Sequence, residues 1–249
     1  MNWTAYVDAY CERVIPGFWS EPLNAISNLA FCFTAWLVWR AWQGVFKQNR
    51  PSAPVITAQA AINKAAIRWD INSLLVLKVL ICAGSFAFHT FATRWAGALD
   101  VLFIALYLHF YMAVYAHRVL VVRWPLAWLG VLVFFLLSQL AGWLWGQGAA
   151  AIGGTLLARA GAASGYLGAW TVLVLLVVHS TWRRLPFAKM LAGAAAVFAV
   201  SLTLRQLDMP LCSDWRFGTH FVWHLLNATT LGLTSWAMVK AAQTAGNNK

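Results

Sequence analysis

Two histidines one helical turn apart lie at the start of the last apolar run of this chain. His220 and His224 are separated by four residues, a spacing that places both imidazoles on one face of a helix. An imidazole in an apolar segment is costly unless it is hydrogen-bonded, hydrated or bound to a ligand. The pair is therefore a candidate metal site, and zinc is a metal that imidazole ligands suit.

A third histidine and two more polar residues come from the middle of the chain. Ser85 and His89 are again one helical turn apart, and Asp100 follows His89. His89, His220 and His224 make a set of three imidazoles, and three protein ligands with an open fourth position is the geometry of catalytic zinc. Bound zinc lowers the pKa of water toward neutrality. A carboxylate beside it, here Asp100, can act as general base and then as general acid.

Several of these polar residues have alternative interpretations. Ser85 can donate a hydrogen bond to a developing oxyanion, or it can orient a metal ligand from behind. Asp100 can instead be the N-cap of a helix. His109, His117 and His179 are interpreted as packed polar residues or proton-relay elements, since the last two lie near basic loops.

The composition is that of a polytopic helical membrane protein with an all-α fold. The chain has 249 residues, 61% of them hydrophobic and 10% charged, whereas a soluble domain is near a quarter charged. Apolar stretches long enough to cross a bilayer recur along the whole length. We predict one domain over residues 1–249 with an extracytoplasmic segment 1–22. The seven predicted spans are about 23–43, 73–92, 97–117, 124–145, 162–179, 186–204 and 218–239.

The segments outside the spans carry further predictions. The N-terminal segment has no basic start and no small-residue cleavage site, so it is not interpreted as a removable signal peptide; an uncleaved signal anchor is the alternative. The 47–72 connection is expected to hold a short surface helix around 56–68. A tight turn is expected near Arg94–Gly97. The 146–160 stretch, rich in Gly and Ala, is expected to be a loose connector.

The positive charges sort between alternate connections. The first, third and fifth connections and the C-terminus carry Arg40, Lys47, Arg50, Lys64, Arg68, Arg118, Arg123, Arg183, Arg184, Lys189, Lys240 and Lys249. The second, fourth and sixth connections carry Arg94, Arg159, Arg205 and Arg216. The positive-inside rule then places the N-terminus outside and the C-terminus in the cytoplasm.

This topology brings the candidate site together. His89, Asp100, His220 and His224 all fall at the outer ends of their spans, at one membrane depth. The net charge of +11 lies in short loops between apolar runs, where it determines topology. The charge therefore argues against nucleic acid as a partner.

Further motifs surround these residues. They are Tyr10-Cys11-Glu12-Arg13 and Glu21-Pro22-Leu23-Asn24-Ala25-Ile26-Ser27-Asn28-Leu29 before and into the first span, and Leu207-Asp208-x-x-x-Cys212 before the last. Together with Ser85-x-x-x-His89, Asp100 and His220-x-x-x-His224, they resemble the alkaline ceramidases. These belong to a superfamily of seven-span hydrolases (CREST) that includes the adiponectin receptors. The resemblance covers essentially the whole chain.

The resemblance implies an intramembrane amidase that cleaves ceramide to a sphingoid base and a fatty acid. One catalytic zinc would be bound by His89, His220 and His224. Asp100 would act as general base and acid, and Ser85 would polarise the amide oxygen. The implied partners are lipids alone: the lipid substrate and the surrounding membrane.

Two more features follow from the resemblance. A calcium ion would bind Asp8, the Tyr10 carbonyl, Glu12 and Glu21, although Ala9 and Val14 depart from the family's pattern. The alternative is that Glu12 and Glu21 cap helices or pair with Arg13 and Arg216. A disulfide would join Cys11 to Cys212, since both fall on the outer, oxidising side.

Other functions are compatible with the same residues. A zinc hydrolase of the same superfamily could act on another lipid amide or an ester, because the metal site does not distinguish these carbonyls. A receptor or scaffold could use the zinc structurally. A proton-coupled transporter could use His and Asp as a relay, but no broken, inverted-repeat helices are visible. The expected location is a bacterial inner membrane, with the site in its outer half; no oligomeric state is predicted.

Overall fold

The structure is a computed structural model that describes residues 2–48, 69–151 and 155–247. Within these residues the fold is all-α, as predicted. The helices are α1 (Pro22–Ser27), α2 (Leu29–Gln48), α4 (Trp69–Phe91), α5 (Arg94–Arg118), α6 (Trp124–Ala151), α7 (Thr155–Trp182), α8 (Ala188–Leu207) and α9 (His220–Asn247).

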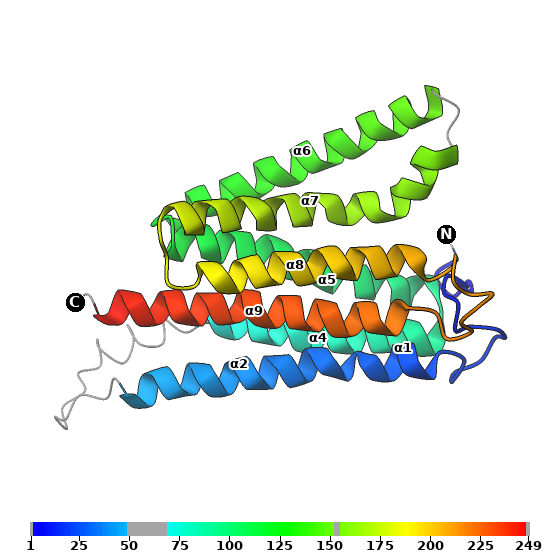
Figure 1. The fold of residues 1–249 in the computed structure, drawn as a ribbon, viewed down its shortest axis with the longest axis horizontal. Coiled ribbons are helices and arrows are strands. Elements are labelled where there is room, and N and C mark those ends of the chain that lie inside the picture. Colours follow the sequence, from blue (N-terminus) through cyan, green and yellow to red (C-terminus); the bar gives the residue numbers. More distant parts are fainter. Residues whose placement is uncertain (1, 49–68, 152–154, 248–249) are drawn as a thin grey trace.

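The long helices form an elongated bundle with α9 at its centre. Helix α9 packs against α8 and α2 and also contacts α4 and α5, while α6 and α7 contact each other beside them. The N-terminal segment and the α8–α9 connection lie at one end of the bundle, and the C-terminus lies at the other (Figure 1). The first turns of α9 carry His220 and His224. They therefore lie at the end of the bundle where the N-terminal segment is found (Figure 1).

Four helical stretches of the described chain are long and apolar enough to cross a membrane. They are Pro22–Val45, Trp69–Phe91, Arg94–Arg118 and Ala188–Leu207. Each is near the length that about 30 Å of hydrocarbon requires. Two shorter apolar helical stretches, Trp124–Leu140 and Tyr166–Trp182, accompany them. These features indicate a membrane protein.

Three predictions about connections have different outcomes. The expected surface helix at 56–68 lies outside the described residues. The loose connector at 146–160 is wrong: α6 continues to Ala151 and α7 begins at Thr155. The Gly and Ala content of this stretch does not predict a loop. In an apolar medium the backbone has no water to hydrogen-bond, so it favours a helix whatever side chains it carries. The tight turn expected near Arg94–Gly97 is present but lies earlier, at Ala92 and Thr93, because Arg94–Gly97 are already helical.

Two contacts fix the register between antiparallel helices α4 and α5. At the end of the bundle away from the site, Arg118 donates from Nε and Nη2 to the two carboxylate oxygens of Asp70, at 2.6 and 2.7 Å. Near the other end, a Cβ added at Gly84 would lie 2.9 Å from the Phe103 side chain and 3.2 Å from the Leu99 carbonyl oxygen. The missing side chain at Gly84 therefore lets α5 approach α4 closely, one residue before Ser85.

Candidate metal centre

Three histidines from two helices converge at the end of the bundle where the N-terminal segment lies. His89 is in the last turn of α4, and His220 and His224 are in the first two turns of α9. Their ligand-capable nitrogens all lie within 4.8 Å of one another. All three side chains are buried, at 0 to 1% exposure. The predicted convergence is confirmed, and this group can hold a metal ion.

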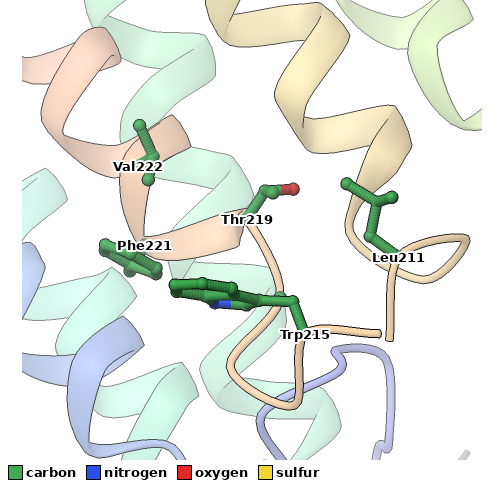
Figure 2. A pocket seen from close by; sticks show the side chains of 6 residues that line it. Leu211, Trp215, Thr219, Phe221 and Val222 are labelled. Carbon is green, nitrogen blue, oxygen red and sulfur yellow. The ribbon is translucent and has the colours of Figure 1, made fainter. Parts of the chain in front are cut away.

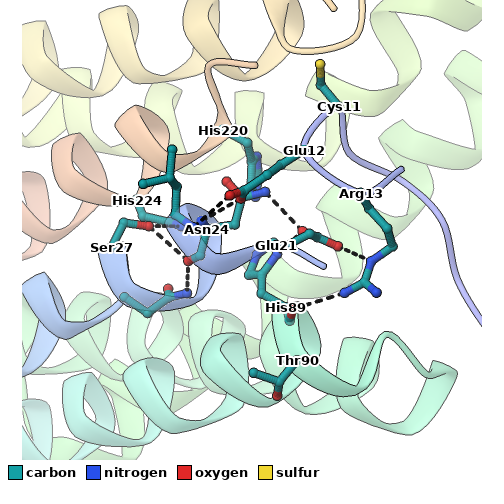
Figure 3. A network of polar contacts seen from close by, with 12 residues as sticks. Cys11, Glu12, Arg13, Glu21, Asn24, Ser27, His89, Thr90, His220 and His224 are labelled. Carbon is teal, nitrogen blue, oxygen red and sulfur yellow. Dashed lines mark hydrogen bonds and ion pairs between the residues drawn. The ribbon is translucent and has the colours of Figure 1, made fainter. Parts of the chain in front are cut away.

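At least one nitrogen of each of these imidazoles is available to a metal. The Nδ1 of His89 lies 2.5 Å from Glu21 Oε2, and the Nδ1 of His224 lies 2.8 Å from Ser27 Oγ (Figure 3). The Nε2 atoms of both rings, and both nitrogens of His220, have no hydrogen-bond partner among the described residues. Buried polar atoms are normally paired. Unpaired nitrogens that converge are the donor set a metal ion requires, and a carboxylate behind one of them is a common feature of such sites.

Asp100 and Ser85 lie beside the histidines, as predicted. Both are buried, at 7% and 1% exposure. Asp100 is close enough to His89 and to Ser85 for each to act on its carboxylate. The Ser85 hydroxyl nevertheless has no hydrogen bond of standard geometry to a described residue. Asp100 is not an N-cap, because α5 begins at Arg94 with Thr93 in that position.

The N-terminal segment covers the histidines. The Tyr10 ring stacks on the His220 ring with centroids 3.8 Å apart, and its centroid is 5.0 Å from that of His89. Arg13 Nη2 donates to the His89 carbonyl at 3.0 Å. Burial raises the pKa of the Tyr10 hydroxyl, which therefore stays protonated. The sequence predicts only a backbone role for Tyr10, whereas in the structure its side chain packs on His220.

A disulfide and one aspartate hold this segment to the start of α9. Cys11 and Cys212 are bonded, with Cα atoms 5.4 Å apart, in agreement with the predicted pairing. Asp208 accepts hydrogen bonds from the amides of Cys11, Thr219 and His220 at 3.0, 2.7 and 2.9 Å. Gly218 has φ +62°, and a Cβ there would lie 2.1 Å from the Asp208 carboxylate. Asp208 therefore connects the covering segment to the helix that carries two of the histidines.

The proposed calcium ligands make other contacts. Glu12 accepts hydrogen bonds from the amides of Leu23 and Asn24 at 2.7 and 2.8 Å, at the start of α1. Burial, the largest influence, raises the pKa of Glu12. The Asp8 side chain is exposed.

Glu21 is held by three side chains. It forms an ion pair with Arg13 and accepts a 3.0 Å hydrogen bond from Asn24 Nδ2, in addition to its contact with His89. Burial by itself would raise the pKa of Glu21, but hydrogen bonding and charge from His89, Asn24 and Arg13 outweigh it and lower that pKa. The contacts seen are therefore those of the alternative interpretation, a cap and an ion pair with Arg13. Calcium binding stays a prediction.

The remaining histidines are hydrogen-bonded to nearby groups. The Nδ1 atoms of His109, His117 and His179 lie 2.7, 2.9 and 2.9 Å from the Ala105 carbonyl, the Val122 carbonyl and the Tyr115 hydroxyl. These contacts agree with packed polar residues. Cys32 and Cys82 are free thiols.

An apolar groove lies at the start of α9, beside the α8–α9 connection. It has a volume of about 300 Å³ and is lined by Leu211, Trp215, Gly218, Thr219, Phe221 and Val222 (Figure 2). None of the three histidines lines it. The groove is therefore a separate apolar surface that flanks His220 in the sequence.

The groups that orient the imidazoles are not evident from the sequence. Glu21 contacts His89 in addition to being a predicted calcium ligand, and Ser27 contacts His224. Both residues belong to the N-terminal motif quoted above, and that motif is the sequence signal that could have identified them.

In comparisons with known proteins, no family model, no curated protein and no solved structure matches this chain.

Proposed function

We propose that this chain is a zinc-dependent lipid amide hydrolase that acts within the membrane. The observation that carries the proposal is the convergence of unpaired nitrogens from His89, His220 and His224 beside the buried carboxylate of Asp100. A structural zinc site usually has four protein ligands, whereas among the described residues this group has three. A carboxylate next to an incomplete ligand set is the arrangement a hydrolase requires.

The donor set fits zinc. Three neutral imidazoles are ligands that zinc prefers, and the carboxylate of Glu21 behind His89 fixes the ring so that Nε2 faces the centre. Bound zinc would supply Lewis acidity that activates water and polarises a carbonyl. The charged Glu21 and the hydroxyl of Ser27 determine which nitrogens of their partners stay available.

The residues beside the zinc ligands would move the proton. Asp100 would accept a proton from the attacking water and return it to the amine that leaves, since its buried carboxylate lies near His89 and Ser85, whereas the carboxylate of Glu21 is held by Arg13 and Asn24. Ser85 would donate a hydrogen bond to the amide oxygen or hold Asp100 in place. The second role is favoured by the position of Ser85 beside that carboxylate.

The topology in this proposal has seven spans. Seven helices of 20 residues or more occur in the described chain, and the charge distribution favours an outer N-terminus and a cytoplasmic C-terminus. The metal centre would lie in the outer half of a bacterial inner membrane. The Cys11–Cys212 disulfide supports an oxidising compartment at that end.

The proposed substrate is ceramide, and the resemblance to alkaline ceramidases is what supports it. The chain should release a fatty acid from labelled ceramide when the purified protein is incubated with it. The same assay with other N-acyl lipids and with ester lipids tests the nearest alternative. Cleavage of esters or glycerolipids alone would exclude the ceramidase assignment, and no cleavage of any lipid would favour a receptor or scaffold with structural zinc.

Glu21→Gln should weaken zinc binding without removing it. Glutamine keeps the size of the side chain but loses the charge that orients His89 and offsets Arg13. Loss of such a group typically lowers metal affinity about 10- to 100-fold. Chelator competition on purified protein measures the change. The matched control is Glu12→Gln, which alters a carboxylate that accepts hydrogen bonds from the backbone amides of Leu23 and Asn24 and makes no hydrogen bond to an imidazole of the described residues. Equal zinc affinities of the two variants would refute the orienting role.

A further inference from the structure

A lysine lies in the interior of the bundle without a hydrogen-bond partner. Lys78 is near the middle of α4, in a stretch long and apolar enough to cross a membrane, and its side chain is fully buried. Its Nζ has no hydrogen-bond partner among the described residues. Buried lysines usually extend so that the ammonium reaches water, and an isolated buried charge is costly. A protonated Lys78 therefore requires an anionic partner.

Two thiols lie beside Lys78. Cys82 is one helical turn further along the same face of α4 and is buried in the main hydrophobic core, and Cys32 of α2 packs against that core. Helices α2 and α4 are in contact. The two thiols are close enough for their sulfurs to interact, and Cys32 is close enough to Lys78 to act on its charge. These three residues form one polar cluster between α2 and α4, which we call the thiol–lysine cluster.

The thiol–lysine cluster is separate from the histidine centre. Cys82 precedes His89 in α4 by a distance of about 10 Å along the helix axis. Both cysteines of the cluster are free thiols. Within the described part of the chain, no third His, Cys, Asp or Glu joins them to make a larger ligand group. An ion bound here would therefore have to be one that two thiolates satisfy.

Two thiolates and one ammonium favour a soft monovalent cation. Thiolates select soft metals, among them Cu(I) and zinc, but zinc in proteins usually takes four ligands. Around a divalent ion, two thiolates and the Lys78 ammonium would leave one positive charge in an apolar core. Around Cu(I) the same groups sum to zero. This neutrality lowers the cost of keeping all of them buried.

We propose that Cys32 and Cys82 bind one Cu(I) ion as thiolates, with the Lys78 ammonium as the counter-charge. Binding forms two Cu–S bonds and releases the proton of each thiol to solvent, and the copper is neither oxidised nor reduced. The side chain of Cys32 is only half-buried, which gives the ion a route of entry. The site is independent of the proposed hydrolytic function, because it shares no residue with the histidine centre.

Cu(I) titration of the purified full-length protein tests the site. The protein is first saturated with zinc to fill the histidine centre, then titrated under nitrogen with ascorbate and a competing chromogenic Cu(I) chelator. We expect about one Cu(I) per chain, with sulfur neighbours in its X-ray absorption spectrum, and almost none in Cys82→Ser. Cys32→Ser, at the half-buried position, should lose the ion equally and serves if Cys82→Ser does not fold.

Lys78→Met tests the counter-charge. It removes the ammonium at nearly constant size and should weaken Cu(I) binding about tenfold or more, while the two sulfur neighbours remain. The matched control is Lys189→Met, the same change at an exposed position in the first turn of α8, which should keep the wild-type affinity. An intact Cys11–Cys212 bond reports folding of each variant.

The wild-type spectrum decides the proposal even if every variant fails to fold. Copper without sulfur neighbours, or no copper bound against the chelator, would overturn it, as would equal Cu(I) affinities of Cys82→Ser and wild type. Wild-type affinity in Lys78→Met would refute the counter-charge. No lipid enters the experiment, so a chain that hydrolyses none would refute the proposed function and leave this result unchanged.

Discussion

His220→Ala should produce a folded protein that has lost its zinc and its hydrolytic activity. His220 is the only one of the three histidines with neither ring nitrogen hydrogen-bonded to a described residue, so its removal affects the metal more than the surrounding contacts. Two imidazoles alone leave zinc short of the three protein ligands that a catalytic site keeps. Metal analysis should show about one zinc in the wild type and almost none in the variant.

A second histidine variant controls for general damage. His109→Ala removes a half-buried imidazole that bonds to the Ala105 carbonyl of its own helix, away from the metal centre. It should keep the zinc and the activity. Zinc content unchanged in His220→Ala would show that the histidine group does not bind the metal, and the catalytic proposal would fail with it.

The helices and the histidine group were predictable because both depend on local patterns. A run of apolar residues determines a transmembrane helix from its length alone, and a spacing of four residues places His220 and His224 on one face whatever surrounds them. The meeting of His89 with this pair needed one more argument, the distribution of positive charge, which placed the ends of α4 and α9 at the same side. The structure agrees with that placement.

The contacts that orient the site were not predictable, because they join residues far apart in the chain. Glu21 reaches His89 across 68 positions, and Ser27 reaches His224 across 197. No periodicity records such a contact. The same holds for Arg205, whose position inside α8 rather than in a loop depended on a helix boundary three residues beyond the predicted one.

The close approach of α5 to α4 is a third example. It depends on Gly84, whose missing side chain leaves room for Leu99 and Phe103. In the sequence, a single glycine in an apolar run indicates only a small loss of helix propensity. Which helix uses the space is determined by tertiary packing, and this packing puts Asp100 beside Ser85.

Asp100→Asn should keep the zinc and lose the turnover. The carboxylate is buried two helical turns into α5, beside His89 and Ser85, and it makes no cap that asparagine would disrupt. Asparagine has nearly the same shape but cannot accept a proton from water. General acid–base catalysis contributes on the order of 10²- to 10⁴-fold, so the hydrolysis rate should fall by that factor while metal analysis still shows one zinc.

Zinc content and hydrolysis rate, measured together, distinguish a carboxylate that carries a proton from one with a structural role. A structural Asp100 would change zinc content or thermal stability when altered, whereas a proton carrier changes the rate alone. The control Asp214→Asn makes the same chemical change at an exposed position between the disulfide and α9 and should leave the rate unchanged. Full activity in Asp100→Asn would mean that another group carries the proton.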